Sequence, residues 1–163
     1  MHEQIEGIYR AINEQDLDAL DGYIAAEYVD HSDGQHGVEA FKRQISVFRS
    51  AFPDLRVTVE DTVEDGDRIA TRTTVTGTQT GELMGIPASG KSVQVSAVDI
   101  ARFENGKAVE RWGGLDTFSL MVQLGVIPVP QTAGGGGSRV RSATPPYSNH
   151  GVERERRLDR ATL

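Results

Sequence analysis

The sequence predicts an α+β fold, in which helices at the start of the chain cover one face of a curved, mixed or antiparallel sheet and enclose an apolar pocket. Two observations carry this prediction. Up to Phe52 the apolar residues recur at helical spacing, and from Leu55 onward they alternate with polar residues as in half-buried strands. Asn105-Gly106, a frequent two-residue hairpin turn, joins the last two predicted strands.

Two helices are predicted to open the chain. Apolar residues mark the first helix over 5–12 and the second over 17–24, and Asp16 is a suitable N-cap for the second. Residues 28–31 read Tyr-Val-Asp-His and are expected to end this second helical region. A chain crossing the mouth of the pocket there could point His31 inward, where an imidazole can donate a hydrogen bond or exchange a proton.

A third helix is predicted over 38–52, and it ends before Pro53 because helical backbone is disfavoured for the residue before a proline. Alternation and β-branched residues then predict strands, and a short helix before Gly125 is expected to close the fold. The expected strands cover residues 55–59, 68–78, 91–103 and 107–115, and the closing helix covers 118–124.

Residues 1–128 are expected to form one domain, and residues 129–163 a flexible tail. The tail contains the linker-like run GGGGS and six arginines against three acids, and most of it is expected to be disordered. The tail therefore has a net charge of +3. Because the net charge of the whole chain is −7, that of residues 1–128 is −10, which disfavours nucleic acid as a partner.

The composition also limits the chemistry and the location. Cysteine is absent, which excludes thiol nucleophiles and cysteine-based metal sites and fits the reducing cytoplasm, the expected location. The sequence lacks an apolar run long enough to cross a membrane, so no membrane association is expected. The four histidines do not have the spacing of metal ligands, so no metal is expected.

A match to the phosphate-binding pattern G-x-x-x-x-G-K-[ST] occurs at residues 85–92. That loop requires a buried strand before it and a helix after it, so that the helix N-terminus faces the phosphates. Because Ser92 here opens a predicted strand, we expect a simple turn.

Acidic residues on apolar strand faces are the main sign of a functional site. Alternation puts Asp99 in a stripe of Val, Ala and Phe residues that faces the core. If the last strand stays regular, Glu110, Trp112 and Asp116 share one face with a glycine that makes room. Burial raises the pKa of a carboxyl group, which suits acid/base catalysis near neutral pH. The structural alternatives are a hydrogen-bonded core residue for Asp99 and an N-cap of the closing helix for Asp116.

Several segments of residues 1–128 resemble the SnoaL-like polyketide cyclases, also called ester cyclases, within the NTF2-like superfamily. These segments occur in the family's order and spacing and are fairly specific together. They read YVDH (28–31), FPDL (52–55), TGELMGIPASGKSV (80–93), DIARFENGKAVERW (99–112) and QLGVIP (123–128), with Asp116 between the last two. The resemblance implies an NTF2-like cone of helices on a curved sheet, a homodimer, and no cofactor or metal.

The resemblance also implies a reaction and the residues that carry it. Cyclases of this family close a ring in a polyketide ester by aldol chemistry, with a pocket aspartate as acid and base, and Asp116 matches that position. His31 and Asp99 would orient or polarise carbonyl groups, and Trp112 would stack on a small apolar or aromatic polyketide-like substrate. The other expected substrate contacts are Tyr28, Gln79, Met84 and Glu110, with Gln79 standing where relatives often carry His.

Two other functions stay open, because one fold serves many activities. The pocket could bind a small apolar molecule without catalysis, with Asp99 and Asp116 as structural residues. It could also serve an isomerase or a hydrolase. An Asp-Arg-Asp hydrolase requires an inward-facing arginine, and strand alternation turns Arg102 and Arg111 away from Asp99, which argues against epoxide hydrolysis.

Overall fold

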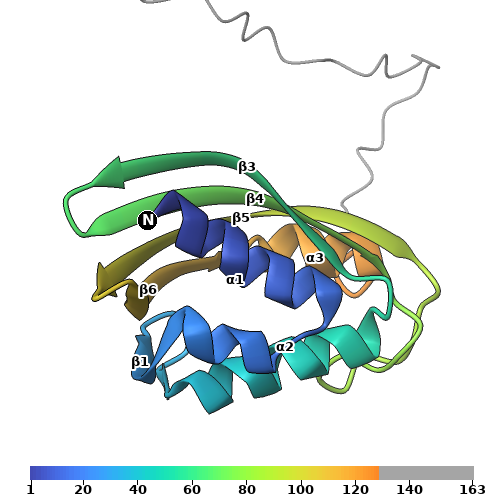
Figure 1. The fold of residues 1–163 in the computed structure, drawn as a ribbon. Coiled ribbons are helices and arrows are strands. Elements are labelled where there is room, and N and C mark those ends of the chain that lie inside the picture. Colours follow the sequence, from blue (N-terminus) through green and yellow to red (C-terminus); the bar gives the residue numbers. More distant parts are fainter. Residues whose placement is uncertain (129–163) are drawn as a thin grey trace, which may run out of the picture. The chain divides into compact units, whose positions relative to one another are not determined.

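The structure, a computed structural model, describes residues 1–128. This part of the chain forms a six-stranded mixed sheet with α1 and α2 beneath it, which confirms the α+β prediction (Figure 1). The helices are α1 (His2–Glu14), the short 3-10 helix η1 (Asp18–Gly22), α2 (Val38–Ala51) and α3 (Thr117–Leu124). The strands are β1 (Ile24–Asp30), β2 (Gln35–His36), β3 (Arg56–Asp65), β4 (Arg68–Thr78), β5 (Ser92–Glu104) and β6 (Lys107–Leu115).

The sheet has the strand order β2-β1-β6-β5-β4-β3, and all neighbours run antiparallel except β1 and β6. The long strands curve over α1 and α2 (Figure 1). At the predicted hairpin turn, Asn105 and Gly106 have φ angles of 49° and 78°, and a type I′ turn requires positive φ at both positions. This turn places β6 directly beside β5, with Gly113 opposite Asp99.

The predicted second helix is wrong. Asp16 Oδ1 does accept a hydrogen bond from the Ala19 amide at 3.2 Å, but the helical turn there is only the five-residue helix η1, and its N-cap residue is Leu17. Ile24 then begins strand β1, which pairs in parallel with β6 at the other end of the domain sequence. The apolar residues of 17–24 fit one helical turn as well as the start of a strand, and the non-local pairing with β6 decides between them.

Two clusters of buried side chains hold the helices against the sheet. In the first, Ile5, Ile8 and Ile12 of α1 pack with Ile69 of β4 and Phe103 of β5. The second joins the end of α2 to α3 and β5, and its members include Phe52, Leu55, Leu83, Val93, Val95, Leu120 and Leu124. The face of the sheet that carries these residues is called the inner face below, and the opposite face is the outer face.

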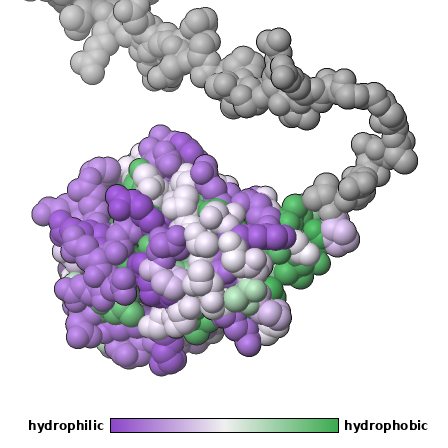
Figure 2. Space-filling view, turned by 90° about the vertical axis from the view of Figure 1, so that its right-hand side faces the viewer, coloured by the Kyte–Doolittle hydropathy of each residue, from purple (hydrophilic) through white to green (hydrophobic). Residues whose placement is uncertain are grey.

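The predicted tail, residues 129–163, lies outside the described residues. Within residues 1–128, no helix is long and apolar enough to cross a membrane. One face of this domain is mostly hydrophilic, with hydrophobic residues gathered in small areas (Figure 2).

Candidate functional site

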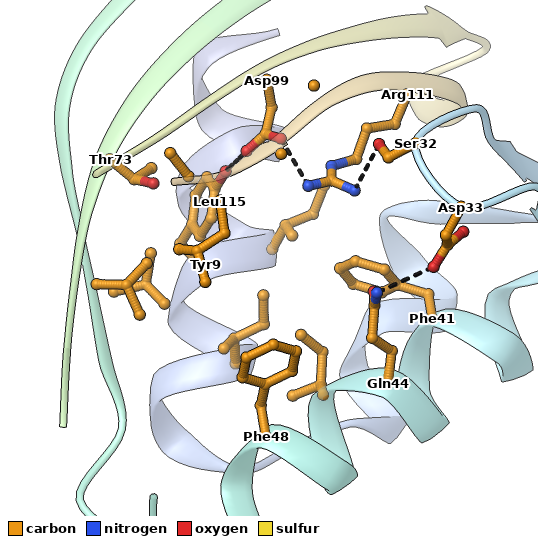
Figure 3. A pocket seen from close by; sticks show the side chains of 18 of the residues that line it. Tyr9, Ser32, Asp33, Phe41, Gln44, Phe48, Thr73, Asp99, Arg111 and Leu115 are labelled. Atoms are coloured by element: carbon orange, nitrogen blue, oxygen red, sulfur yellow. Dashed lines mark hydrogen bonds and ion pairs between the residues drawn. The ribbon is translucent and has the colours of Figure 1, made fainter. Parts of the chain in front are cut away.

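A cavity of about 990 Å³ lies between α1, α2 and the inner face of the sheet. Its wall is mostly apolar, with aliphatic residues from α1 and the rings of Phe41 and Phe48 from α2. Figure 3 shows these two rings on one side of the cavity, with Asp99 and Arg111 on the opposite side, where the sheet lies. The size and the apolar lining suit a small organic molecule.

Three polar residues that line this cavity, Tyr9, Asp99 and Arg111, form a connected group with Asp30, which does not line it. We call these four residues the acid–arginine cluster. The Arg111 guanidinium donates from Nη2 to Asp99 Oδ1 at 2.6 Å and from Nη1 to Asp30 Oδ2 at 2.5 Å. The Tyr9 hydroxyl donates to Asp99 Oδ2 at 3.4 Å (Figure 3). Asp30 and Asp99 are only 3% and 8% exposed, so both carboxylates depend on Arg111 as a partner.

A β-bulge at Val109 decides which side chains of β6 face the cavity. Phe103 pairs with Ala108, but the preceding residue of β5, Arg102, pairs with Glu110, so Val109 is an extra residue in β6. An extra residue reverses the faces of the side chains that follow it, because alternate residues of a strand point to opposite faces.

The bulge turns Arg111 inward and its neighbours outward. Arg111 pairs with Ala101 on the inner face, whereas Trp112 pairs with the half-exposed Ile100 on the outer face. The expectation of a regular strand, with Glu110 and Trp112 facing the pocket and Arg111 facing away, is therefore wrong.

His31 lies with Trp112 and Glu110 and not with the cavity. Its imidazole stacks on the Trp112 ring, with centroids 4.8 Å apart and an angle of 5° between the planes, and its Nε2 lies 3.6 Å from Glu110 Oε1. Arg68 covers the same Trp112 ring, and Arg102 donates to Glu110 Oε2 at 2.6 Å. None of His31, Glu110 and Trp112 lines the cavity, so the structure does not bring these three expected site residues to it.

Asp116 caps helix α3 and does not reach the cavity. Its Oδ1 accepts a hydrogen bond from the Ser119 amide at 3.0 Å, and its Oδ2 accepts one from the Ser119 hydroxyl at 2.6 Å. These bonds to Ser119 lower the pKa of the exposed carboxyl, whereas a proton carrier near neutral pH needs a raised one. The expectation that Asp116 faces the pocket is corrected in favour of its structural alternative, the N-cap.

The other expected substrate contacts differ in their position. Tyr28 is buried and lines the cavity beside Phe41, and Met84 lines it from an exposed position. Gln79 is fully buried in the connection between β4 and β5, where its side chain bonds to the backbone of Ile86 and Ser89, and it does not line the cavity. This connection leads into strand β5 and not into a helix, so the phosphate-loop pattern is indeed a simple turn.

The electrostatic surroundings give Asp99 and Tyr9 different protonation behaviour. Burial raises the pKa of Asp99, and the neighbouring Arg111 offsets part of this effect. Burial, together with the charge of Asp99, raises the pKa of Tyr9, so Tyr9 remains a neutral phenol that donates hydrogen bonds. Burial alone would lower the pKa of Arg111, but Asp99 and Asp30 outweigh it and keep the guanidinium charged. The cluster thus holds two carboxylates that accept hydrogen bonds, Asp30 and Asp99, next to two donors, Tyr9 and Arg111.

Tyr9, Asp30 and Arg111 are the site residues that sequence reasoning missed. Tyr9 lies in the apolar stripe of α1 and looked like a core residue. Asp30 follows Tyr28 and Val29, and an acid at the end of an apolar segment is the signal that could have identified it. No sequence feature marks the bulge that turns Arg111 inward.

We expect Gly113→Ala to destabilise the domain by about 1–3 kcal/mol, because the new methyl group would overlap the backbone beneath Asp99. Gly113 has a φ of +132°, and a Cβ there would lie 2.2 Å from the Val98 carbonyl oxygen and 2.9 Å from Asp99 Oδ1. Gly114→Ala is the matched control, since a Cβ at that position meets nothing within 4 Å. Urea unfolding of both variants measures the difference, and equal stability of the two would contradict this role of Gly113.

Comparison with known proteins agrees with this fold. The model of the family described as SnoaL-like polyketide cyclase matches residues 3–124. TsrD from Streptomyces laurentii superimposes with a TM-score of 0.73 at 33% identity, covering 77% of this chain and 95% of TsrD. AclR from Streptomyces galilaeus, provisionally assigned as a hydroxylase, gives 0.72 at 30% identity, covering 80% of this chain and 84% of AclR.

A third solved structure carries a cyclase assignment. IdmH from Streptomyces antibioticus, provisionally assigned as a polyketide cyclase, superimposes with a TM-score of 0.67 at 31% identity. The match covers 76% of this chain and 97% of IdmH. No protein of curated function matches the chain by sequence.

Proposed function

The chain belongs to the family of SnoaL-like polyketide cyclases, and we propose that it closes a ring in a small polyketide-like substrate with Asp99 as general base and acid. One observation carries the proposal: Asp99 is a buried carboxyl group of raised pKa in the wall of an apolar cavity. A carboxylate in such a place can remove a proton near neutral pH. In this proposal Asp99 takes the part that the family resemblance suggested for Asp116.

In the proposed reaction, Asp99 accepts a proton from a methylene group that lies between two carbonyl groups of the substrate. The enolate carbon then attacks another carbonyl carbon of the same molecule and forms the new carbon–carbon bond. The oxygen of the attacked carbonyl takes the proton back from Asp99, so the product is a cyclic β-hydroxy compound and no co-reactant is consumed. The neutral Tyr9 hydroxyl is placed to stabilise negative charge on a substrate oxygen near Asp99.

Arg111 and Asp30 act through Asp99 in this proposal. The bond from Arg111 Nη2 fixes Asp99 Oδ1, while Asp30 holds the other end of the guanidinium. Because the guanidinium stays charged, it limits how far burial raises the pKa of Asp99. Arg111 and Asp30 are therefore positioning residues.

The lining of the cavity supports a planar or aromatic substrate. Phe41 and Phe48 face the sheet side across the cavity, so a flat molecule can pack on them while its oxygens point to the acid–arginine cluster (Figure 3). The acidic charge of residues 1–128 supports a small molecule over nucleic acid as the partner.

Exchange of hydrogen for deuterium tests the proton abstraction without knowledge of the natural substrate. We expect the protein to accelerate exchange at the methylene group of ethyl benzoylacetate, an aromatic β-keto ester, in deuterated buffer above the buffer rate, as followed by proton NMR. A protein that only binds small apolar molecules would bind this probe without accelerating the exchange, and that result would favour the non-catalytic alternative.

Hydrolysis of an epoxide is a second candidate function, and one observation favours it. Arg111 faces the cavity between Asp30 and Asp99, so the argument from strand alternation against a hydrolase no longer holds. In this reaction Asp99 would accept a proton from the water that attacks the epoxide carbon, Tyr9 would protonate the leaving oxygen, and Asp99 would return a proton to Tyr9. Incubation with styrene oxide in water labelled with heavy oxygen tests this: a labelled diol above background supports hydrolysis, and unchanged epoxide contradicts it.

The family resemblance also predicts a homodimer, and the outer face of the sheet supports this as a proposal. Val63, Val98 and Ile100 are 68%, 54% and 41% exposed there, although large aliphatic side chains are usually buried. Sedimentation equilibrium checks the proposal: twice the mass of the chain is expected, and the mass of one chain would contradict it.

A further inference from the structure

Thr71 brings an unpartnered hydroxyl group to the wall of the cavity. The residue is 2% exposed, lies on the inner face of β4 and lines the cavity. Among residues 1–128, its Oγ1 is one of two buried side-chain polar atoms without a hydrogen-bond partner. Buried polar groups are nearly always paired, because an unpaired one loses its bonds to water without replacement. The Thr71 hydroxyl thus calls for a partner that enters the cavity.

The position of Thr71 relates this hydroxyl to Asp99. The two residues are direct partners across β4 and β5, and both face inward. Side chains opposite each other in an antiparallel pair have Cβ atoms about 5 Å apart. One small group can therefore contact both.

Asp99 also has free capacity to accept hydrogen bonds. Its Oδ1 is engaged by Arg111 at 2.6 Å, but its Oδ2 receives only the long 3.4 Å bond from Tyr9. A carboxylate oxygen can accept two bonds. If the Tyr9 hydroxyl turns its single proton from Asp99 Oδ2 to a ligand, the Thr71 and Tyr9 hydroxyls offer two donors and Asp99 Oδ2 offers an acceptor in a mostly apolar cavity.

We propose that Thr71 and Tyr9 bind a carbonyl or enol oxygen of the ligand beside Asp99, forming an oxygen subsite that selects ligands with an enolisable ketone or an equivalent phenol. Such an oxygen accepts a bond from the Thr71 hydroxyl as a carbonyl, and as an enol it can also donate to Asp99 Oδ2. This inference rests on the proposed function, because the selected oxygen is the one next to the carbon that Asp99 deprotonates. It names Thr71 as a residue that determines specificity.

Binding of two matched aromatic probes tests the subsite. 1-Naphthol carries an oxygen of the required kind, and naphthalene has the same rings without it. We expect the wild-type protein to bind 1-naphthol more tightly than naphthalene in a fluorescence titration. We expect Thr71→Val, which keeps the shape of the side chain and removes the hydroxyl, to weaken 1-naphthol binding roughly fivefold or more and to leave naphthalene binding unchanged. Thr71→Ser keeps the hydroxyl and should retain the preference for 1-naphthol.

Thermal unfolding without ligand separates a binding role from a structural one. If the hydroxyl serves the ligand, Thr71→Val should unfold at the wild-type temperature or above it, since the substitution removes an unpaired buried group. A clearly lower unfolding temperature would mean that the hydroxyl has a partner within the protein, and it would overturn the proposal. Equal wild-type affinity for the two probes, or no effect of Thr71→Val on 1-naphthol binding, would also overturn it.

The experiments distinguish a failure of the oxygen subsite from a failure of the proposed cyclase mechanism. If the probes behave as expected but ethyl benzoylacetate shows no accelerated exchange, the oxygen subsite stands and the cyclase mechanism falls. If exchange is accelerated and Thr71→Val changes neither binding nor exchange, the mechanism stands and the subsite falls.

Discussion

Replacement of Asp99 by Asn is expected to lower the rate of methylene exchange, and of any ring closure, by roughly 10²–10⁴-fold. Asn has nearly the shape of Asp and its amide oxygen can still accept the bond from Arg111 Nη2, but it cannot take up a proton. Initial exchange rates by NMR measure the effect, and the affinity for naphthalene, which has no oxygen to contact position 99, measures whether the cavity remains intact. A variant that binds the probe and exchanges at the wild-type rate would exclude Asp99 as the base.

Asp116→Asn is the matched control for this variant. The substitution weakens the cap of α3 outside the cavity, so a modest loss of stability is expected and the exchange rate should stay at the wild-type value. Loss of exchange in Asp116→Asn, with retention in Asp99→Asn, would return the catalytic role to Asp116.

Replacement of Arg111 by Met is expected to cost about 3–5 kcal/mol of unfolding free energy. The substitution preserves an elongated side chain but leaves Asp30 and Asp99 as buried carboxyl groups without their shared cation. Urea unfolding measures the loss. Arg72→Met is the control, because Arg72 and its partner Asp61 are a solvent-exposed pair and such pairs contribute little.

The loss in Arg111→Met should depend on pH. Burial raises the pKa of Asp99 in the folded state, so the stability linked to this group is present at low pH and is lost as pH rises through the folded-state pKa. Arg111 lowers the pKa of Asp99, so its removal raises that pKa further. Ionisation of Asp99 in the folded variant is then more costly than in the wild-type protein. The deficit relative to wild type should therefore be larger at pH 8 than at pH 5. A deficit that is constant with pH would mean that Arg111 acts through packing alone.

Alternation in β5 was sufficient to place Asp99 correctly. The sequence from Val93 to Phe103 has a strict period of two, and each inward position of this regular strand is buried in the structure. The Asn105-Gly106 turn likewise fixed the hairpin, because few residues accept positive φ at two successive positions. Local rules work where local structure is regular.

The same rule failed in β6 because of one residue. The bulge at Val109 reverses every later side chain of the strand, which exchanges Arg111 for Glu110 and Trp112 in the cavity. Nothing in the spacing of residues 107–115 distinguishes a bulged strand from a regular one. The hydrogen bond between Arg111 and Asp30 could not be predicted from local sequence either. It depends on the parallel pairing of β1 with β6, and these strands are far apart in sequence.

Local contacts hold the side chains of Asp116 and His31 away from the cavity, although the sequence predicts that both act in it. The sequence Asp-Thr-Phe-Ser carries an N-cap pattern, and the capping bonds to Ser119 determine where the Asp116 side chain lies. His31 follows β1 and stacks on Trp112, and the bulge in β6 places Trp112 on the outer face.

The most direct measurement is a crystal structure of the Asp99→Asn variant soaked with ethyl benzoylacetate, in which slow proton transfer leaves the probe unchanged. The proposed function predicts the methylene carbon next to the side chain at position 99, a carbonyl oxygen near Tyr9, and the aromatic ring against Phe41 and Phe48. A probe bound on the outer face at the His31–Trp112 stack, or in the cavity with its methylene group away from position 99, would contradict the assignment of this cavity as the active site.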